Sequence, residues 1–302
     1  MKLGTIKLTL RRKVKNWLDS ISDEALKEFL ADNVMVCGGA IASFLQNKSA
    51  NDYDLYFKTY DAALKVAHHY VNRFNAENKL VGSCNDYAPK VTEQDVVNIN
   101  NEAEKRILCR MQSAGVASVE HKYFESQLDT EGTDFVDSLN KTIDEVVEVA
   151  KSKTDEYAPI FLTDNAISLK GKVQIIIRFH GDKEEIFKNF DFVHACCCYD
   201  YAKDELFIHP KAMESLLTNR LIYQGSLYPI CSFFRIRKFL YRDWRISAGQ
   251  MLNIVYQISK IDFSNIEQMK EQLIGVDSAY MYDLLRELES AKAKNIRIDQ
   301  LY

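Results

Sequence analysis

A strand, two glycines and a helix follow one another early in the chain, and this order constrains the fold more than any other feature. The apolar run 34–37 ends in Gly38 and Gly39, and residues 40–45 have the composition of a helix start. Glycines at such a junction let backbone N–H groups approach an anion, and the helix start adds a favourable dipole. The order therefore indicates either a site for a nucleotide triphosphate or a plain tight turn.

Two aspartates begin the next predicted strand, residues 52–57, in which acidic and aromatic residues alternate. Residues two apart in a strand share one face and lie about 6.6 Å apart. The carboxylates of Asp52 and Asp54 therefore repel each other in a structure that already disfavours aspartate. A pair of Mg²⁺ ions would relieve that repulsion. The alternative is a solvated edge strand with two exposed acids.

A third acid, Asp191, lies in the apolar run 190–198, which we predict to be a strand. A carboxylate without a partner is costly in such surroundings, and a metal ion would supply the partner. Asp164 is the rival candidate, but it precedes a bend and has the character of a turn residue. We favour Asp191 as the third acid.

Taken together, Gly38, Gly39 and Ser43, followed by Asp52 and Asp54, resemble the signature of the DNA polymerase β-type nucleotidyltransferase superfamily. The resemblance implies that the glycines and the serine hold a nucleoside triphosphate. It also implies that the two aspartates and a third acid bind two Mg²⁺ ions, with Mn²⁺ as a substitute. Asp191, as the third acid, would contact the catalytic-side ion and accept or relay the proton of the acceptor hydroxyl.

The chain as a whole also resembles uncharacterised nucleotidyltransferase-like proteins of tailed bacteriophages. The segments that carry this resemblance are 165–167, 190–194 and 226–239. One departure is informative, because residues 40–42 lack the Arg-Asp pair expected of CCA-adding tRNA enzymes. A CCA-adding role is therefore disfavoured.

The pattern of elements predicts an α+β fold in two parts. Residues 1–210 would form a mixed-sheet nucleotidyltransferase palm with a helical insertion at about 85–155, and residues 211–302 an all-helical domain that closes the cleft. The expected strands are 34–37, 52–57, 160–163, 166–169, 173–179, 190–198 and 206–208. The expected helices are 12–21, 23–30 with Ser22 as its N-cap, 61–75, 93–112, 133–152, 183–188, 211–221, 229–245, 248–258, 266–273 and 279–293.

Charge is distributed unevenly along the chain, although the formal net charge is only −4. Residues 121–150 contain eight acids and two lysines, whereas residues 211–260 contain eight basic side chains and two acids. The acidic stretch is either a solvated helix pair or a segment that folds over the basic helix. The local imbalance matters more for a polyanionic substrate than the net charge does.

The predicted helix 229–245 is amphipathic, with its apolar residues Phe233, Ile236, Leu240 and Trp244 on one face. At about 100° per residue, its basic side chains gather on the opposite face. These are Arg235 and Lys238, which would reach the triphosphate, and Arg242 and Arg245, which would meet a longer polyanion. The alternative is a solvated cationic face.

Other residues carry weaker indications. Arg178 ends an apolar strand and would either enter the same cleft or form a plain salt bridge. Phe234, Tyr241 and Tyr228 would stack on a base, although such residues are more often core. Seven cysteines, an odd number without a paired framework, indicate a reducing cytoplasm, and Cys196–Cys198 are expected in the core.

The sequence therefore predicts a cytoplasmic metal-dependent nucleotidyltransferase, in the host cytoplasm if a phage encodes it, with no membrane segment. It would move a nucleoside monophosphate from an NTP to an acceptor hydroxyl, and we favour an RNA 3′ end, including that of tRNA. Protein NMPylation, a toxin or defence-type transferase, and a non-catalytic nucleotide- or RNA-binding module are the alternatives. The acceptor, the preferred base and the oligomeric state stay open.

Overall fold

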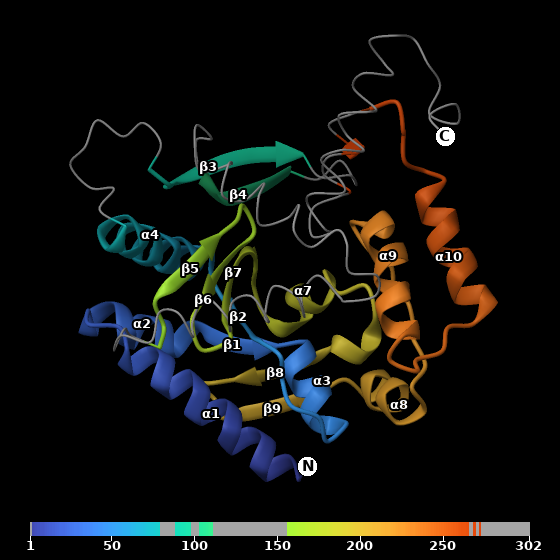
Figure 1. The fold of residues 1–302 in the computed structure, drawn as a ribbon, viewed down its shortest axis with the longest axis horizontal. Helices are drawn as coiled ribbons and strands as arrows, with labels where there is room; N and C mark the ends of the chain where they lie inside the picture. Colours follow the sequence, from blue (N-terminus) through green and yellow to red (C-terminus); the bar gives the residue numbers. More distant parts are fainter. Residues whose placement is uncertain are drawn as a thin grey trace.

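A seven-stranded mixed sheet forms the centre of the molecule in the computed structural model (Figure 1), which describes residues 2–78, 88–97, 103–110, 156–265, 268, 269 and 272. The strand order is β5-β6-β7-β2-β1-β8-β9. The bounds are β1 (Val34–Cys37), β2 (Tyr53–Phe57), β5 (Pro159–Leu162), β6 (Ala166–Leu169), β7 (Val173–His180), β8 (Cys197–Asp200) and β9 (Glu205–Ile208). The predicted mixed sheet with helices is confirmed.

The middle of the sheet is the strand pair that the sequence singled out. β1 pairs with β2 in antiparallel register, so that Cys37 lies opposite Asp54, and β8 flanks the other side of β1. β2 runs parallel to β7, while the other strand pairs of the sheet are antiparallel. All four residues of β1 are buried, as an apolar run in the middle of a sheet requires.

Three helices cover one face of this sheet, namely α1 (Leu3–Asp19), α2 (Glu24–Asn33) and α4 (Tyr60–Glu77), which lie to the left in Figure 1. α1 buries residues at helical spacing, and the largest is Trp17. Its indole N–H donates to the hydroxyl of Tyr70 at 2.8 Å, and its ring lies 6.3 Å from that of Phe57. α1 begins well before the predicted 12–21.

The N-cap of α2 is Asp23, whose side chain accepts the N–H of Leu26 at 3.0 Å, so the prediction of Ser22 was wrong by one residue. A carboxylate at this position also favours the positive end of the helix dipole.

The predicted helix 93–112 is wrong. β3 (Lys90–Val97) and β4 (Ala103–Arg110) pair there as an antiparallel two-stranded ribbon, above the main sheet in Figure 1. Four consecutive residues of β4, from Arg106 to Cys109, are buried, because the ribbon packs against α4 and β7. The predicted helix 133–152 and the acidic stretch 121–150 lie outside the described residues.

Helices follow the last strand, as the sequence predicted. They are α8 (Pro210–Thr218), α9 (Pro229–Leu240) and α10 (Ala248–Ile258), which lie together on the right in Figure 1. The short α3 (Gly39–Leu45) and α7 (Lys183–Phe187) complete the described α-helices. An all-helical domain over 211–302 and a boundary near residue 210 stay predictions, because the predicted helix 279–293 and most of 266–302 lie outside the described residues.

α9 stops at Leu240, short of the predicted residue 245. Asp243 has a φ of +61°, and the N–H of Trp244 donates to the carbonyl of Phe239 at 3.0 Å, so the chain turns back there. The predicted apolar face was also partly wrong: Ile236 is buried, but Phe233 and Leu240 are 46% and 49% exposed.

A second, smaller core joins these helices to the sheet through Phe192. This residue and Trp244 are buried with Leu216, Leu221, Tyr223, Ile236 and Ile254. The buried imidazole of His194 packs against Phe239 and Trp244, with ring centroids 4.7 Å apart in both cases. Its Nδ1 has no hydrogen-bond partner among the described residues.

Burial lowers the pKa of His194 from 6.5 to about 4. The unfolded chain binds the proton more readily than the folded protein does. The contribution of neutral His194 to the free energy of unfolding is therefore fully present above pH 6.5 and is lost as the pH falls towards 4. At about 1.36 kcal/mol per pKa unit, this group removes roughly 3 kcal/mol from the free energy of unfolding across that window. We expect His194→Met to flatten the pH profile of urea unfolding. An unaltered slope in His194→Met would contradict this role.

The six described cysteines are buried and reduced, and they include Cys196, Cys197 and Cys198, which confirms their place in the core. Within the part of the chain that the structure describes, no helix has the length and apolar character needed to span a membrane.

Candidate active site

Asp54 lies in the middle of the sheet, on the face opposite the helices α1 and α4. Strand alternation places it with Tyr56 on one face, whereas Phe57 points the other way and contacts Trp17. Asp52 lies just before β2, two residues from Asp54. β2 lies between β1 and β7, and both aspartates are half-buried. The alternative of a solvated edge strand with two exposed acids is therefore wrong.

Gly38 turns the chain from β1 into α3 beside this acid. Its φ of +88° is one that L side chains rarely adopt, and a Cβ there would lie 3.8 Å from Oδ2 of Asp54 and 3.6 Å from the ring of Phe190. Its N–H donates to the carbonyl of Cys197 at 3.0 Å and so serves the sheet. The turn therefore brings the backbone against the Asp54 carboxylate.

The other two residues of the predicted triphosphate site lie on α3. Gly39 is its first residue, and the space around its Cα is open. Ser43 lies one turn further along and is half-buried. Gly38, Gly39 and Ser43 thus lie in the turn and helix that follow β1. Asp54 lies on β2, the neighbouring strand.

The surroundings of Asp54 disfavour its charged form. Burial and then the charge of Asp52 raise the pKa of Asp54 well above its usual range. Two close carboxylates supply the hard oxygen ligands that Mg²⁺ and Mn²⁺ prefer, and a divalent cation would relieve the repulsion. Asp52 and Asp54 therefore fit one such cation.

Tyr56 lies close enough to the two aspartates and to Arg235 of α9 for their charges to affect it. Burial, followed by the charges of Asp54 and Cys37, raises the pKa of Tyr56 well above its usual range, and the nearby guanidinium of Arg235 opposes the rise. The Tyr56 ring also makes an edge contact with Phe190, with centroids 6.0 Å apart. Sequence reasoning missed Tyr56, although the two-residue period from Asp54 was a signal for it.

Asp191 lies in a loop, not in the predicted strand 190–198. The 3-10 helix η1 (Val193–Ala195) follows it, and β8 begins only at Cys197. Its carboxylate is buried, accepts the N–H of Phe192 at 3.0 Å and forms an ion pair with Arg235, with Oδ2 and Nη1 2.8 Å apart. Asp191 in turn raises the pKa of Arg235.

The loop that carries Asp191 is fixed by Gln224, which the sequence gave no reason to single out. The N–H of Gln224 donates to the carbonyl of Asp191 at 3.0 Å, and its side-chain amide donates to the carbonyls of Phe187 and Phe190. Across the described residues, no group of three or more His, Cys, Asp and Glu side chains is placed to hold a metal ion. The described geometry thus gives Asp191 an arginine as its partner.

Arg178 matches the salt-bridge alternative. Its Nε lies 3.4 Å from Oε1 of Glu104 on β4, and its Nη2 donates to the hydroxyl of Tyr228, the N-cap of α9. Tyr228 is thus engaged by an arginine, and Glu104 was not predicted because it lies in the segment that we expected to be helical.

The four basic side chains predicted on one face of the helix 229–245 are separated by the end of α9 at Leu240. Arg235 and Lys238 lie on the helix, and Lys238 is half-buried. Arg242 lies in the turn that follows. The backbone of Arg245 forms an isolated β-bridge with that of Arg220. The structure therefore brings Arg235 to Asp191 and leaves Arg242 and Arg245 off the helix.

The comparisons with known proteins give one family and two individual similarities. A structure of the Thermotoga maritima CCA-adding enzyme complexed with tRNA covers 95% of this chain and 63% of its own, with 13% identity and a TM-score of 0.36, too low to establish a shared fold. Gabija anti-defense 2 from Bacillus phage SPbetaL7 is 27% identical over 128 residues, which are 42% of this chain and 32% of that protein. Residues 8–219 match the profile described as Gabija anti-defense 2 family protein, so the chain belongs to that family.

Proposed function

We propose that this chain is a metal-dependent nucleotidyltransferase that moves a nucleoside monophosphate from an NTP to an acceptor hydroxyl. The observation that carries the proposal is the turn at Gly38, whose positive φ brings the backbone against the half-buried Asp54, two residues from Asp52. A glycine turn beside two oxygen ligands suits a triphosphate and the divalent cation that accompanies it.

Each residue then has a defined task. Asp52 and Asp54 hold Mg²⁺ or Mn²⁺, which when bound supplies positive charge at the phosphates. The backbone beyond Gly38, from Gly39 onward, and the hydroxyl of Ser43 contact the triphosphate. The amide of Gly38 takes no part, because Cys197 already accepts its hydrogen bond.

Asp191 and Arg235 exchange partners when the nucleotide binds. Without nucleotide, Arg235 neutralises the Asp191 carboxylate at 2.8 Å. A triphosphate offers Arg235 a stronger anionic partner, and this frees Asp191 to accept the proton of the attacking hydroxyl. Lys238, one turn along α9, adds charge for the phosphates, while Arg242 and Arg245 meet a longer polyanion. Two ions held by all three acids would require Asp191 to leave Arg235 first.

Family membership points to the biological setting. We infer that the chain is phage-encoded, as its relative is, and that it acts in the host cytoplasm against the Gabija system. An RNA or tRNA 3′ end is the favoured acceptor, and a hydroxyl of a host defence protein is the second choice.

Incubation of the protein with each α-labelled NTP, Mg²⁺ or Mn²⁺ and a host cell extract tests this function. We expect divalent-cation-dependent label in RNA, in a protein band or in a small nucleotide product, which identifies the acceptor class. Absence of label from all NTPs with both metals would contradict a transferase.

A second candidate is a non-catalytic nucleotide- or RNA-binding module with the same architecture. The Asp191–Arg235 ion pair favours it, because the third acid already has a cation partner. Asp52→Ala with Asp54→Ala separates the two, since a transferase loses its effect on Gabija with its label transfer, whereas a binding module keeps that effect.

A further inference from the structure

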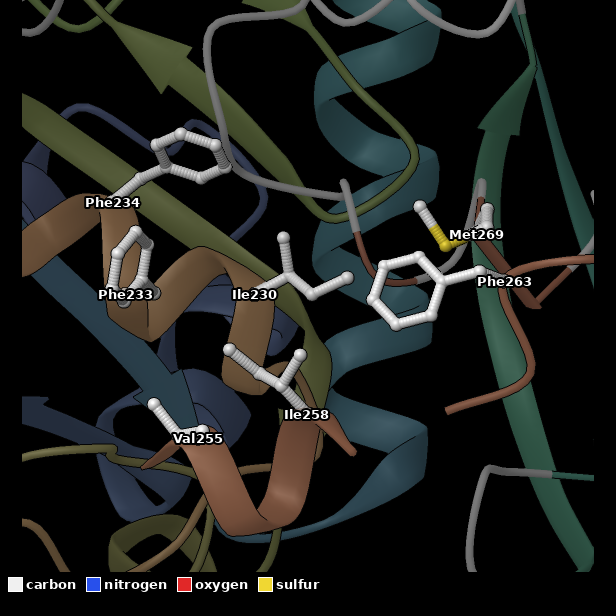
Figure 2. Close-up of a pocket in the computed structure, with 7 residues that line it drawn as sticks. All are labelled: Ile230, Phe233, Phe234, Val255, Ile258, Phe263 and Met269. Carbon is white, nitrogen blue, oxygen red and sulfur yellow. The ribbon is translucent and has the colours of Figure 1, made fainter. Parts of the chain in front are cut away.

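The two helices α9 and α10 expose an unusual amount of apolar surface. Figure 2 shows side chains of α9 and α10 around a groove of about 390 Å³, with Phe263 and Met269 on its far side. The exposed large apolar side chains of the α9–α10 surface are Phe233, Phe234, Leu240, Met251, Leu252, Val255 and Tyr256. A large group of exposed apolar side chains marks an interaction site more often than single ones do.

α10 is the clearest part of this surface. It has no charged side chain, and of its 11 residues only Ile254 is buried. Leu252 is 66% exposed and Tyr256 61%. A helix that is apolar on its inner and outer sides alike is expected to be covered on both.

Two cations flank the surface. Nζ of Lys260 is 4.4 Å from the ring centroid of Tyr256 on α10. Arg237 lies on α9 one turn after Phe233, and its guanidinium is 5.7 Å from the ring centroid of the exposed Tyr241, which follows the helix. An apolar groove with cations at its rim complements an apolar ridge with acids beside it.

We propose that the α9–α10 surface binds an amphipathic helix of a partner protein, with an apolar ridge flanked by Asp and Glu. The ridge enters the groove beside Phe233 and Val255, in the way that a helix occupies a groove between two others. The acids meet Arg237 and Lys260 at the rim. This interaction does not involve Asp52 or Asp54, so it can be tested independently of nucleotidyl transfer.

A labelled 20-residue synthetic helix tests this surface on the full chain. One version carries Leu along one face and Glu on both flanks, and its partner version carries Lys in place of Glu. We expect fluorescence anisotropy to show that the Glu helix binds at least tenfold more tightly than the Lys helix, with a loss of affinity as salt rises. Equal binding of the two helices would overturn the proposal.

Leu252→Asp and Tyr256→Ser locate the site, and each is expected to weaken binding of the Glu helix at least tenfold. Leu8→Asp is the matched control, because Leu8 is 68% exposed on α1, far along the chain from α10. Unchanged affinity in both Leu252→Asp and Tyr256→Ser would overturn the proposal. So would tighter binding to phosphatidylglycerol vesicles than to the Glu helix, or a dimer of the chain that Leu252→Asp dissociates.

Discussion

Asp54→Asn will lower nucleotidyl transfer at least about a hundredfold, roughly 2.7 kcal/mol of transition-state stabilisation, while the chain remains folded. The reason is that the amide keeps the shape of the carboxylate but not the charge that the proposed divalent cation requires. The same change removes a half-buried acid that Asp52 repels, so we expect the metal-free variant to melt at the same temperature as the wild type or above it. Label transfer and thermal unfolding measure the two effects.

Asp164→Asn is the control for this experiment. Asp164 was the rival for the third acid, and it lies exposed between β5 and β6. We expect this variant to retain wild-type transfer. Full activity in Asp54→Asn would contradict the assigned role, and a lower melting temperature in that variant would show that Asp54 is a structural carboxylate.

Phe192→Ala will lower the free energy of unfolding by about 3–5 kcal/mol, as expected for a large side chain removed from a tight core. Phe192 is fully buried, and its ring lies 5.8 Å from that of Tyr223 and 5.6 Å from that of Phe239. Its backbone also forms a β-bridge with Tyr223, and its N–H donates to the carboxylate of Asp191. The cavity would therefore open between the sheet and the helices, beside the acid.

Urea unfolding measures this loss, and Phe233→Ala is the matched control, because Phe233 is the same residue type in an exposed position on α9. We expect Phe233→Ala to stay within about 0.5 kcal/mol of the wild type. A change of less than 1 kcal/mol in Phe192→Ala would mean that the second core does not fix the helices to the sheet.

Local signals in the sequence predicted the elements wherever the pattern and the end signals agreed. α10 was predicted with its observed bounds, because the apolar helical run covers 248–258. The structure adds that the side chain of Ser247 caps the first turn. β6 was predicted for a similar reason, with a turn on either side of a short apolar run. The candidate acid Asp54 also lies in β2 as predicted, whereas Asp52 lies just before the strand.

Tertiary contacts decided the features that the sequence did not reveal. The loop at Asp191 is held by Gln224, and its acid is paired with an arginine 44 residues away. No periodicity reports such a pairing. The segment 93–112 failed for another reason, since its polar residues fit a helix and a ribbon strand equally well until the ribbon packs against the sheet.

Transfer of label from an NTP marked at the α-phosphate, compared with the same NTP marked at the γ-phosphate, distinguishes nucleotidyl transfer from other phosphoryl transfers. We expect the acceptor to gain the α label alone and the γ label to leave with pyrophosphate. Both outcomes should disappear in Asp54→Asn and after chelation of divalent cations. Incorporation of the γ label would identify a different phosphoryl transfer. Failure to incorporate the α label, in a preparation that still counteracts Gabija, would contradict a transferase and support a binding module.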